Sequence, residues 1–504
     1  MPTDSESQSP NVIFLVSDAA RARNFSAYGY DRPTSPNLEQ IASESTLYTN
    51  AIATAPWTVP SHASMFTGVY TSKHHATRSS PSIRSDLNTL PELLQREGYK
   101  TYCITANHLL ASNNGLNDGF DETYITTRLF PTNTKYGSVK SSFAENGFST
   151  TFLSDIIEFV RNEGSFRDVA NLGYKFAVSQ TNGDIVGERR RTPKGSEGNV
   201  KKLVDIMESG NEPFFTYLNF METHLKYLPP KEHFLSVAPT KHSDVDYSDV
   251  NQDPRLYNYA KAVEMSEEDF ALLQSFYDGT IRHTDYLIGK LYRELSERDL
   301  LENTMFIVVG DHGENLGDFG QMGHSLALND AVVRVPLLIS YPKSTDFVTV
   351  DSLVQTHDLF PTILETSGVS IELDSLLGQD STLLPRHSDD PGREYAIAEY
   401  LGSPFDGIKR IMQKYPETDY DQYDFEIKTI YDNDGMKLTV KSTGERRLAT
   451  VDIDGEEPIE DGANDISDKL EEELFETVES FGKIGTVTHY DEGVEDTLRD
   501  LGYI

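Results

Sequence analysis

Continuous apolar runs alternate with helix-like segments along the first two thirds of the chain. Residues 11–18 are NVIFLVSD, an unbroken apolar stretch that ends in an acid. Such a run is typical of a strand buried on both faces of a parallel sheet. Residues 304–315, TMFIVVGDHGEN, repeat the pattern and lead into Asp311 and His312. We predict that both segments are strands of one sheet whose polar ends meet at the same edge.

Two further segments have the order helix, break, strand. Residues 87–107 end at Asn107, and residues 198–224 end near Glu222 and His224. A long helical pattern over 266–300 precedes the second acid-ended strand. The alternation predicts an α/β fold, a large, mostly parallel sheet sandwiched by helices. In such a fold the ligand site lies at the carboxyl ends of the strands.

The pattern weakens twice, which suggests how the chain is divided. Between about 125 and 200 the residues are mostly Ser, Gly, Asn and charged, so we expect an insertion that covers the site or is a surface excursion. From about 388 short strand patterns and an acidic helix follow. We predict a large domain over 1–387 and a smaller α+β subdomain over 388–504.

Charge and composition narrow the classes of partner. The chain has 44 Lys and Arg against 81 Asp and Glu, a net charge of −37 spread along its length. Such a charge repels phosphate backbones and argues against nucleic-acid binding. It suits either a surface hydrated in high salt or a face for a basic partner, and its even distribution favours the halophilic surface.

The chain shows no targeting or membrane signal. Its amino end, MPTDSESQSP, lacks a basic and an apolar region, and no stretch approaches the ~18 apolar residues of a membrane span. The single cysteine, Cys103, lies in an apolar run and excludes an internal disulfide. We therefore expect a cytoplasmic protein without a membrane span, and the pattern leaves its oligomeric state open.

Three residues after the acid-ended strands have the character of metal ligands. Asp18 and Asp311 offer hard oxygen atoms, and His312 adds an imidazole. Charged groups at the ends of buried strands need partners, which a divalent ion supplies. Because imidazole belongs to the set, we expect Zn or Mn, with Ca or Mg as the alternatives.

A hydroxyl beside such an ion is a candidate nucleophile. In residues 54–68, TAPWTVPSHASMFTG, Thr58 precedes a helix-like stretch whose amino end would favour an anion. Ser61 is the competitor, although its position after Pro60 also suits a helix N-cap. The local pattern favours Thr58 and leaves Ser61 open.

These residues resemble the sulfatases of the alkaline phosphatase superfamily over nearly the whole chain. The segments that carry the resemblance are NVIFLVSD, YGYDRPTSPNLEQIASESTLYTNAIATAPWTVPSHASMFTG, GFDETY, NFMETHLKYLPP, DYLIGKLYREL, VVGDHGENLGDFGQMGHS, RVPLLISYP, HDLFPTIL and LRDLGYI. The resemblance implies a sulfatase-like catalytic domain for residues 1–387. It also implies an enzyme that cleaves sulfuric or phosphoric esters with a metal ion.

This chain departs from the family at its nucleophile. The family motif begins with Cys or Ser, which is oxidised to formylglycine, whereas this chain has Thr58-Val-Pro-Ser-His62. Threonine cannot be converted in this way, because its β-carbon carries a methyl group. The set of Asp18, Thr58, Asp311 and His312 instead resembles the threonine-dependent phosphoryl-transfer members of the superfamily, which include phosphodiesterases and phosphoglycerol transferases.

Four other positions are expected to act on the substrate, three of them by resemblance and Asn107 because it ends a strand at the same edge. His224 and His324 match residues that contact the transferred group, so we expect them to be catalytic together with Thr58, which would also be a metal ligand. His62 and Asn107 are expected to bind substrate, although His62 stands where the family has Arg and so lacks its bidentate contact.

We therefore expect a metal-dependent hydrolase or phosphotransferase that cleaves phosphate esters through Thr58, with a sugar or a lipid as the candidate alcohol portion. Two alternatives stay open at this stage. One is a sulfuric ester hydrolase that works without formylglycine. The other is a non-catalytic binding protein that retains the sulfatase fold.

The acidic composition generates a prediction about salt. At molar salt the Debye length falls to about 3 Å, so repulsion among the excess carboxylates is screened. We expect the folded state to require molar KCl or NaCl, measured by thermal unfolding across a salt series. Rapid refolding to full activity at low ionic strength would contradict the halophilic interpretation.

Overall fold

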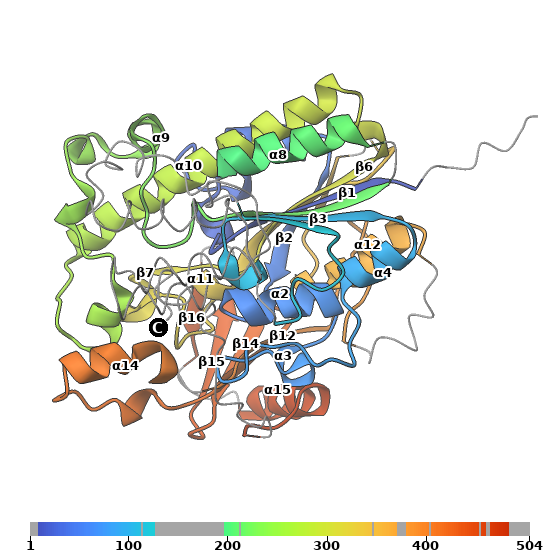
Figure 1. The fold of residues 1–504 in the computed structure, drawn as a ribbon. Helices are drawn as coiled ribbons and strands as arrows, with labels where there is room; N and C mark the ends of the chain where they lie inside the picture. Colours follow the sequence, from blue (N-terminus) through green and yellow to red (C-terminus); the bar gives the residue numbers. More distant parts are fainter. Residues whose placement is uncertain are drawn as a thin grey trace, which may run out of the picture.

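The computed structural model describes residues 9–111, 114–125, 196–210, 213–344, 347–369, 380–402, 405–452, 455–459 and 464–482. Within these ranges nine strands form a central sheet in the order β10-β2-β9-β6-β1-β5-β3-β4, with β11 beside β2 (Figure 1). Their bounds are β1 Asn11–Ser17, β2 Thr46–Ile52, β3 Lys100–Thr105, β4 Glu122–Ile125, β5 Phe214–Phe220, β6 Thr304–Gly310, β9 Arg334–Ser340, β10 Val348–Val350 and β11 Val354–Gln355.

The sheet is mostly parallel, as predicted. Strands β6, β1, β5, β3 and β4 are paired in parallel, whereas β9 runs antiparallel to its neighbours β6 and β2. Because β9 is reversed between them, β2 points in the same direction as β6. The carboxyl ends of β2, β6, β1, β5 and β3 therefore share one edge.

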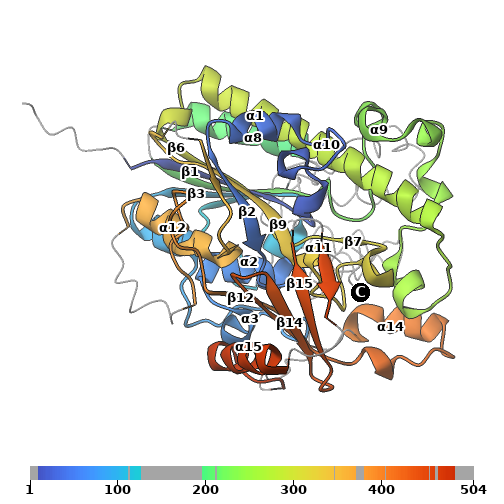
Figure 2. The ribbon, with the colours of Figure 1, turned by 180° about the vertical axis from the view of Figure 1, so that it is seen from behind.

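Helices cover both faces of the sheet, and Figures 1 and 2 show the two layers. One face packs against α2 Thr58–Thr67, α4 Leu90–Arg96 and α12 Leu359–Thr366, and the other against α1 Pro36–Ala42, α8 Ser196–Ser209 and α10 Glu267–Glu297. Strand β1 shows why its apolar run is unbroken. Phe14 and Val16 belong to the first core, and Ile13 and Leu15 to the second.

A tight contact brings the ends of β1 and β6 together. Gly310 ends β6, and a β-carbon at this position would lie 2.6 Å from the carbonyl oxygen of Ala20. Any larger residue would force the two chain segments apart. The close approach keeps Asp18 and Asp311, which follow the two strands, next to each other.

The carboxyl-terminal part of the described chain forms a second sheet. It is antiparallel, and its strands are β12 Tyr395–Tyr400, β13 Ile427–Asp432, β14 Met436–Lys441, β15 Arg446–Val451 and β16 Glu456–Pro458. Helix α15 Asn464–Thr477 packs against it, and α14 Phe405–Lys414 precedes β13. These elements confirm the predicted fold class. The domain boundary near residue 387 stays a prediction.

The described chain also has short α-helices and strands, besides its 3-10 turns. They are α3 Thr71–His74, α9 Lys231–Val237, α11 Asp330–Val333, β7 Asn315–Leu316 and β8 Met322–Gly323. Most of the insertion expected at about 125–200 lies outside the described residues, which resume with α8 at Ser196. Among the helices that are described, none combines the length and the apolar character needed to cross a membrane.

A buried ion pair joins the second sheet to the helices next to the strand edge. Lys428 Nζ lies 2.5 Å from Glu399 Oε1, and both side chains are almost fully buried. The other oxygen of Glu399 accepts a 2.8 Å hydrogen bond from the amide of Ser72 in α3. The amide of Glu399 also donates to the carbonyl oxygen of Thr54, shortly before α2. Glu399 therefore links three segments of the chain.

Removing the cation of this pair should be costly. Lys428→Met leaves the Glu399 charge buried without its cation, which typically costs about 3–5 kcal/mol in the free energy of unfolding. The matched control is Lys441→Met on β14, whose partner Glu445 is 59% exposed. We expect the control to lose less than about 1 kcal/mol. Equal losses in denaturant-induced unfolding would show that the buried pair does not hold the second sheet in place.

Candidate active site

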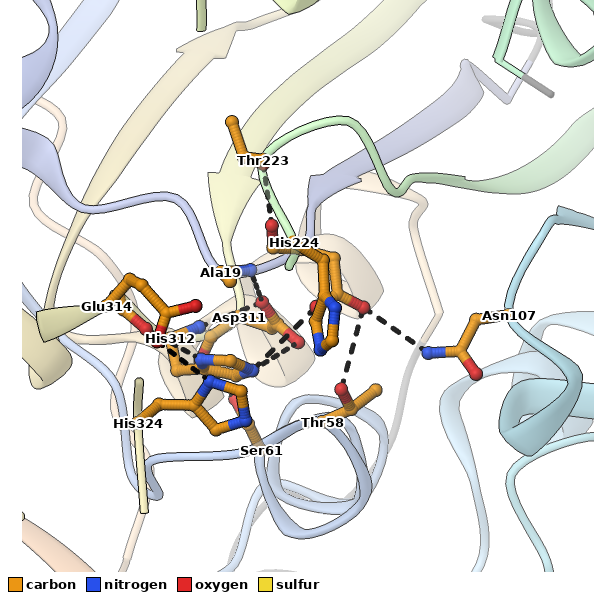
Figure 3. A network of polar contacts seen from close by, with 12 residues as sticks. Ala19, Thr58, Ser61, Asn107, Thr223, His224, Asp311, His312, Glu314 and His324 are labelled. Atoms are coloured by element: carbon orange, nitrogen blue, oxygen red, sulfur yellow. Dashed lines mark hydrogen bonds and ion pairs between the residues drawn. The ribbon is translucent and has the colours of Figure 1, made fainter. Parts of the chain in front are cut away.

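Neighbouring parallel strands place polar side chains at one edge of the central sheet. Asp18 follows β1, Asp311 follows β6, His224 follows β5 and Asn107 follows β3. Figure 3 shows Asp311, His224 and Asn107 gathered around one point, with Thr58 at the start of α2 facing them. All five are buried. The sheet topology thus brings together residues from segments far apart in the sequence.

Asp18, Asp311 and His312 form a compact cluster of metal-ligand type. Each offers one ligand atom, and these atoms lie within 4.8 Å of one another. His312 Nε2 is 3.8 Å from Asp18 Oδ1 and 3.5 Å from Asp311 Oδ2. The three side chains are fully buried. Buried carboxylates and an imidazole at this spacing are suited to a divalent cation.

The hydrogen bonds of the cluster leave these same atoms unsatisfied. Asp311 Oδ1 accepts from the amides of Ala19 and His312, at 3.0 and 2.9 Å. His312 Nδ1 donates to the carbonyl oxygen of Gly313, so its Nε2 carries the lone pair. Within the described part of the chain, Asp18 Oδ1, Asp311 Oδ2 and His312 Nε2 have no hydrogen-bond partner. Three converging buried atoms without partners fit a bound metal ion.

The electrostatics of the cluster favour a cation as well. Burial raises the pKa of Asp311 well above its ordinary value, and the neighbouring charge of Asp18 raises it further. Burial also opposes ionisation of Asp18, but nearby imidazoles, His224 first, bring its pKa below the ordinary value. Burial lowers the pKa of His312 well below its usual range, so its ring is neutral. A neutral imidazole beside two carboxyl groups is the form that binds metal.

Ala19 is held in a strained conformation that supports the cluster. Its φ is 59°, a left-handed value that costs non-glycine residues about 1–2 kcal/mol. Its amide donates to Asp311 Oδ1, and its carbonyl oxygen accepts a 2.8 Å hydrogen bond from the Tyr277 hydroxyl. The strain is therefore offset by bonds that orient Asp311.

Thr58 lies at the amino end of α2, beside Asp18. Its Oγ1 donates to Asp18 Oδ2 at 3.5 Å, and Asn107 Nδ2 donates to the same oxygen at 3.3 Å (Figure 3). The residue before the helix is Trp57, whose indole cannot cap the first amides. The positive end of the helix dipole therefore faces the hydroxyl of Thr58 and any anion bound there.

Ser61 is not the N-cap that its sequence position suggested. It lies inside α2, which begins at Thr58, and its Oγ donates a 2.5 Å hydrogen bond to the carbonyl oxygen of Asp311. The helix starts earlier because Trp57 already adopts an extended conformation. Ser61 thus fastens α2 to the end of β6.

His62 lies within α2, and its contact with substrate stays a prediction. Its Nδ1 lies 2.7 Å from the carbonyl oxygen of Thr58, and its Nε2 lies 2.5 Å from the Tyr217 hydroxyl. Because a carbonyl only accepts, Nδ1 carries the hydrogen and Nε2 accepts from Tyr217. Burial lowers the pKa of His62 to about 4. The ring is neutral and positions the first turn of α2.

His324 and His224 lie next to the cluster. The ring of His324 is 4.4 Å from that of His312 and 5.6 Å from that of His224, between centroids. His324 Nδ1 is 3.1 Å from Glu314 Oε1, and burial lowers the pKa of His324 to about 4. His224 Nδ1 donates to the carbonyl oxygen of Leu225, which orients its ring.

Sequence reasoning missed three residues that support the site. Burial raises the pKa of Glu314 to about 8, and this residue contacts His324. The Thr223 hydroxyl donates to the carbonyl oxygen of Asp18 at 2.6 Å, and Tyr217 bonds to His62. The sequence signal for Glu314 was its position two residues after His312. No local sequence pattern identifies Thr223 or Tyr217 as residues of the site.

Comparisons with known proteins agree with this architecture. The sequence profile of the family described as Sulfatase matches residues 10–369. An arylsulfatase of Clostridium perfringens is 24% identical, over 78% of this chain and 81% of its own length. An N-acetylglucosamine-6-O-sulfatase of Bacteroides thetaiotaomicron is 25% identical, over 74% of this chain and 70% of its own.

Solved structures share the fold. The phosphonate monoester hydrolase of Agrobacterium radiobacter superposes with a TM-score of 0.62 at 16% identity, over 96% of this chain and 100% of its own. A protein solved in complex with its substrate D-glucosamine-2-N,6-O-disulfate gives a TM-score of 0.60 at 17% identity, over 98% of this chain and 99% of its own. The family profile matches most of the chain, and buried side chains of metal-ligand type gather at one edge of its sheet. The chain therefore belongs to the sulfatase family of ester hydrolases.

Proposed function

We propose that this enzyme cleaves phosphate esters through the hydroxyl of Thr58, with a divalent metal ion held by Asp18, Asp311 and His312. The observation that carries the proposal is the position of Thr58. Its hydroxyl reaches Oδ2 of Asp18, while Oδ1 of the same carboxylate belongs to the three atoms without partners. Nucleophile and metal ligands therefore share one carboxylate, and Thr58 lies where it would itself be a ligand.

A bound divalent ion would lower the pKa of the hydroxyl and offset negative charge on the transferred group. The ligand set favours Zn or Mn over Ca or Mg, because a neutral imidazole contributes. The two buried carboxyl groups favour a bound cation of either kind, since the charge of Asp18 raises the pKa of Asp311.

Phosphate is favoured over sulfate by the chemistry of threonine. Formylglycine releases sulfate through its second hydroxyl, and Thr58 has only one. A phosphorylated threonine can be cleaved by water at phosphorus, whereas a sulfated threonine would resolve slowly at sulfur. A single hydroxyl beside the metal ligands therefore suits phosphoryl transfer.

The reaction has two steps, attack by Thr58 and then attack by water, in which the residues around Thr58 have different roles. The Thr58 oxygen bonds to phosphorus as the bond to the departing alcohol breaks. His224, whose Nδ1 hydrogen is held by Leu225, presents Nε2 as the acceptor for the hydroxyl proton and returns that proton to the departing alcohol. His324 and Asn107 contact the transferred group. Water then attacks phosphorus in line and gives its proton to His224, the bond between phosphorus and the Thr58 oxygen breaks, and His224 returns the proton to Thr58. Two in-line steps give net retention, and an alcohol in place of water would give transfer.

Two other functions remain as alternatives. A sulfuric ester hydrolase without formylglycine is favoured by the names of the relatives, one of which is an N-acetylglucosamine-6-O-sulfatase. A non-catalytic binding protein would have no use for the converging unsatisfied ligand atoms. The substrate in either enzymatic case is an anionic ester, and its alcohol portion could belong to a sugar or a lipid.

Replacing the nucleophile tests the reaction directly. We expect Thr58→Ala to lower turnover of 4-nitrophenyl phosphate or bis(4-nitrophenyl) phosphate by at least about 10³-fold, because no other hydroxyl occupies its place. Thr58→Ser should keep measurable activity and should yield a phosphorylated peptide on acid quenching, detected by mass spectrometry. Thr67→Ala, in the last turn of the same helix, is the control. Turnover of 4-nitrophenyl sulfate that survives in Thr58→Ala would overturn the threonine mechanism.

Metal binding can be tested without turnover. We expect Zn or Mn at 100 times its Kd to stabilise the chelator-treated wild type by about 2.7 kcal/mol, measured by thermal unfolding. Asp18→Asn should gain nothing from metal. Asp86→Asn, an exposed site, is the control. Equal metal stabilisation in Asp18→Asn would contradict the ligand assignment.

A further inference from the structure

A buried carboxyl group that the proposed mechanism does not use lies beside the active site. Glu314 directly precedes β7, and its side chain is fully buried. Its amide donates to the carbonyl oxygen of Ala331 at 3.0 Å, and its own carbonyl oxygen accepts from Arg21 Nη1 at 3.1 Å. The backbone is therefore fixed at both of its polar groups. A buried carboxyl group also needs partners for its side chain, and these show what Glu314 holds.

The hairpin of β7 and β8 places Glu314 opposite His324. The two strands are antiparallel with Asn315 facing Gly323, so Glu314 and His324 are the next facing positions. Glu314 Oε1 lies 3.1 Å from His324 Nδ1. Gly323 has a φ of 79°, and a β-carbon there would lie 3.0 Å from the β-carbon of Pro254. A larger residue would therefore disturb the turn that presents His324.

A tyrosine from another segment supports Glu314. The hydroxyl of Tyr227 is hydrogen-bonded to the Glu314 carboxyl group. Tyr227 is buried and lies three residues after His224, and its amide donates a 2.7 Å hydrogen bond to Gln252 Oε1. The carboxyl group is thus held between the loop that carries His224 and the hairpin that leads into His324.

The contact at Nδ1 sets the direction of the His324 ring. This ring lies 4.4 Å from that of the proposed metal ligand His312 and 5.6 Å from that of His224, between centroids. Figure 3 shows Glu314 on one side of the ring and Thr58 on the other. Because the two nitrogens lie on different sides of an imidazole, a partner at Nδ1 directs Nε2 toward Thr58. A hydrogen bond at one edge also restricts rotation of the ring, and such restriction preserves the alignment that a reacting group requires.

We propose that Glu314 is a positioning residue that acts through His324, holding the imidazole so that Nε2 meets the transferred phosphoryl group. Glu314 has no exposed surface, so it acts on that group only through its neighbours. The inference rests on the proposed function, in which His324 contacts the transferred group. A carboxyl group that only anchored the hairpin would stabilise the fold without depending on the imidazole. The two roles differ in whether the effect of Glu314 survives the loss of His324.

Phosphate binding tests this dependence without requiring turnover. The probe is inorganic phosphate, titrated calorimetrically into protein supplied with Mn or Zn. We expect His324→Ala to weaken the Kd for phosphate about 10-fold, because one hydrogen bond to a charged group is lost. Glu314→Met should weaken it by at least about 3-fold in the wild-type background but by less than about 1.5-fold in His324→Ala, which is the non-additivity of one residue acting through another.

Three further variants sharpen the test. Glu314→Gln should stay within about 2-fold of wild type, because an amide can still hydrogen-bond to Nδ1. Tyr227→Phe removes the supporting hydroxyl without changing charge, and it replaces Glu314→Met if that variant does not fold. Its loss of affinity should likewise vanish in His324→Ala. Glu445→Met, at an exposed carboxylate of the second sheet, is the control and should bind phosphate as wild type does.

Two kinds of result would overturn the inference. An equal loss from Glu314→Met in both backgrounds would assign Glu314 to anchoring the hairpin alone. Wild type that fails to bind phosphate, or His324→Ala that binds it as tightly as wild type, would remove the contact on which the inference depends. Phosphate binding in Thr58→Ala should keep its dependence on Glu314, since no bond to Thr58 forms. Failure of the threonine mechanism would therefore be visible separately, in ester turnover alone.

Discussion

The burial of two carboxyl groups side by side is the constraint on which the rest of the site depends. Asp18 and Asp311 are fully buried at the ends of adjacent strands, where burial and the charge of Asp18 raise the pKa of Asp311. Such a pair is expensive unless a cation joins it. The left-handed Ala19 and the close approach at Gly310 keep the pair together in spite of this cost.

Three of the histidines around the pair are neutral, and this shapes what the site can do. Burial lowers the pKa of His62 and His324 to about 4 and that of His312 well below its usual range. These rings therefore act as ligands, acceptors and positioning groups rather than as cations. In the proposed function, positive charge for an anionic substrate comes from a metal ion and from the amino end of α2.

The second sheet contributes to the site as well as to stability. Glu399 on β12 holds the segment before α2 and the start of α3, and Tyr400 beside it faces Arg78. The two residues are neighbours on one strand, so their side chains point to opposite faces. One residue anchors the sheet through its buried ion pair, and the other contacts Arg78, whose Nη1 donates to Ser325 beside His324.

Much of this arrangement could be inferred from local patterns. Unbroken apolar runs mark buried parallel strands, and residues directly after such strands converge at one edge whatever the loops between them do. The fold class and the proximity of Asp18, Asp311 and His312 follow from these two rules. The start of α2 at Thr58 was harder to predict from the sequence. Ser61 stands in a favourable N-cap sequence, but its hydroxyl instead donates to the carbonyl oxygen of Asp311.

The remaining features depend on contacts between distant segments, which no local pattern encodes. His62 faces Tyr217 across 155 positions, and Arg78 reaches Ser325 across 247. Whether a histidine touches substrate or packs beneath a helix depends on which strand lies behind it. Whether a tyrosine hydroxyl is satisfied depends on every segment around it. Hydrophobic periodicity is a property of neighbours in the chain, whereas hydrogen-bond partners are chosen by the packing of the whole domain.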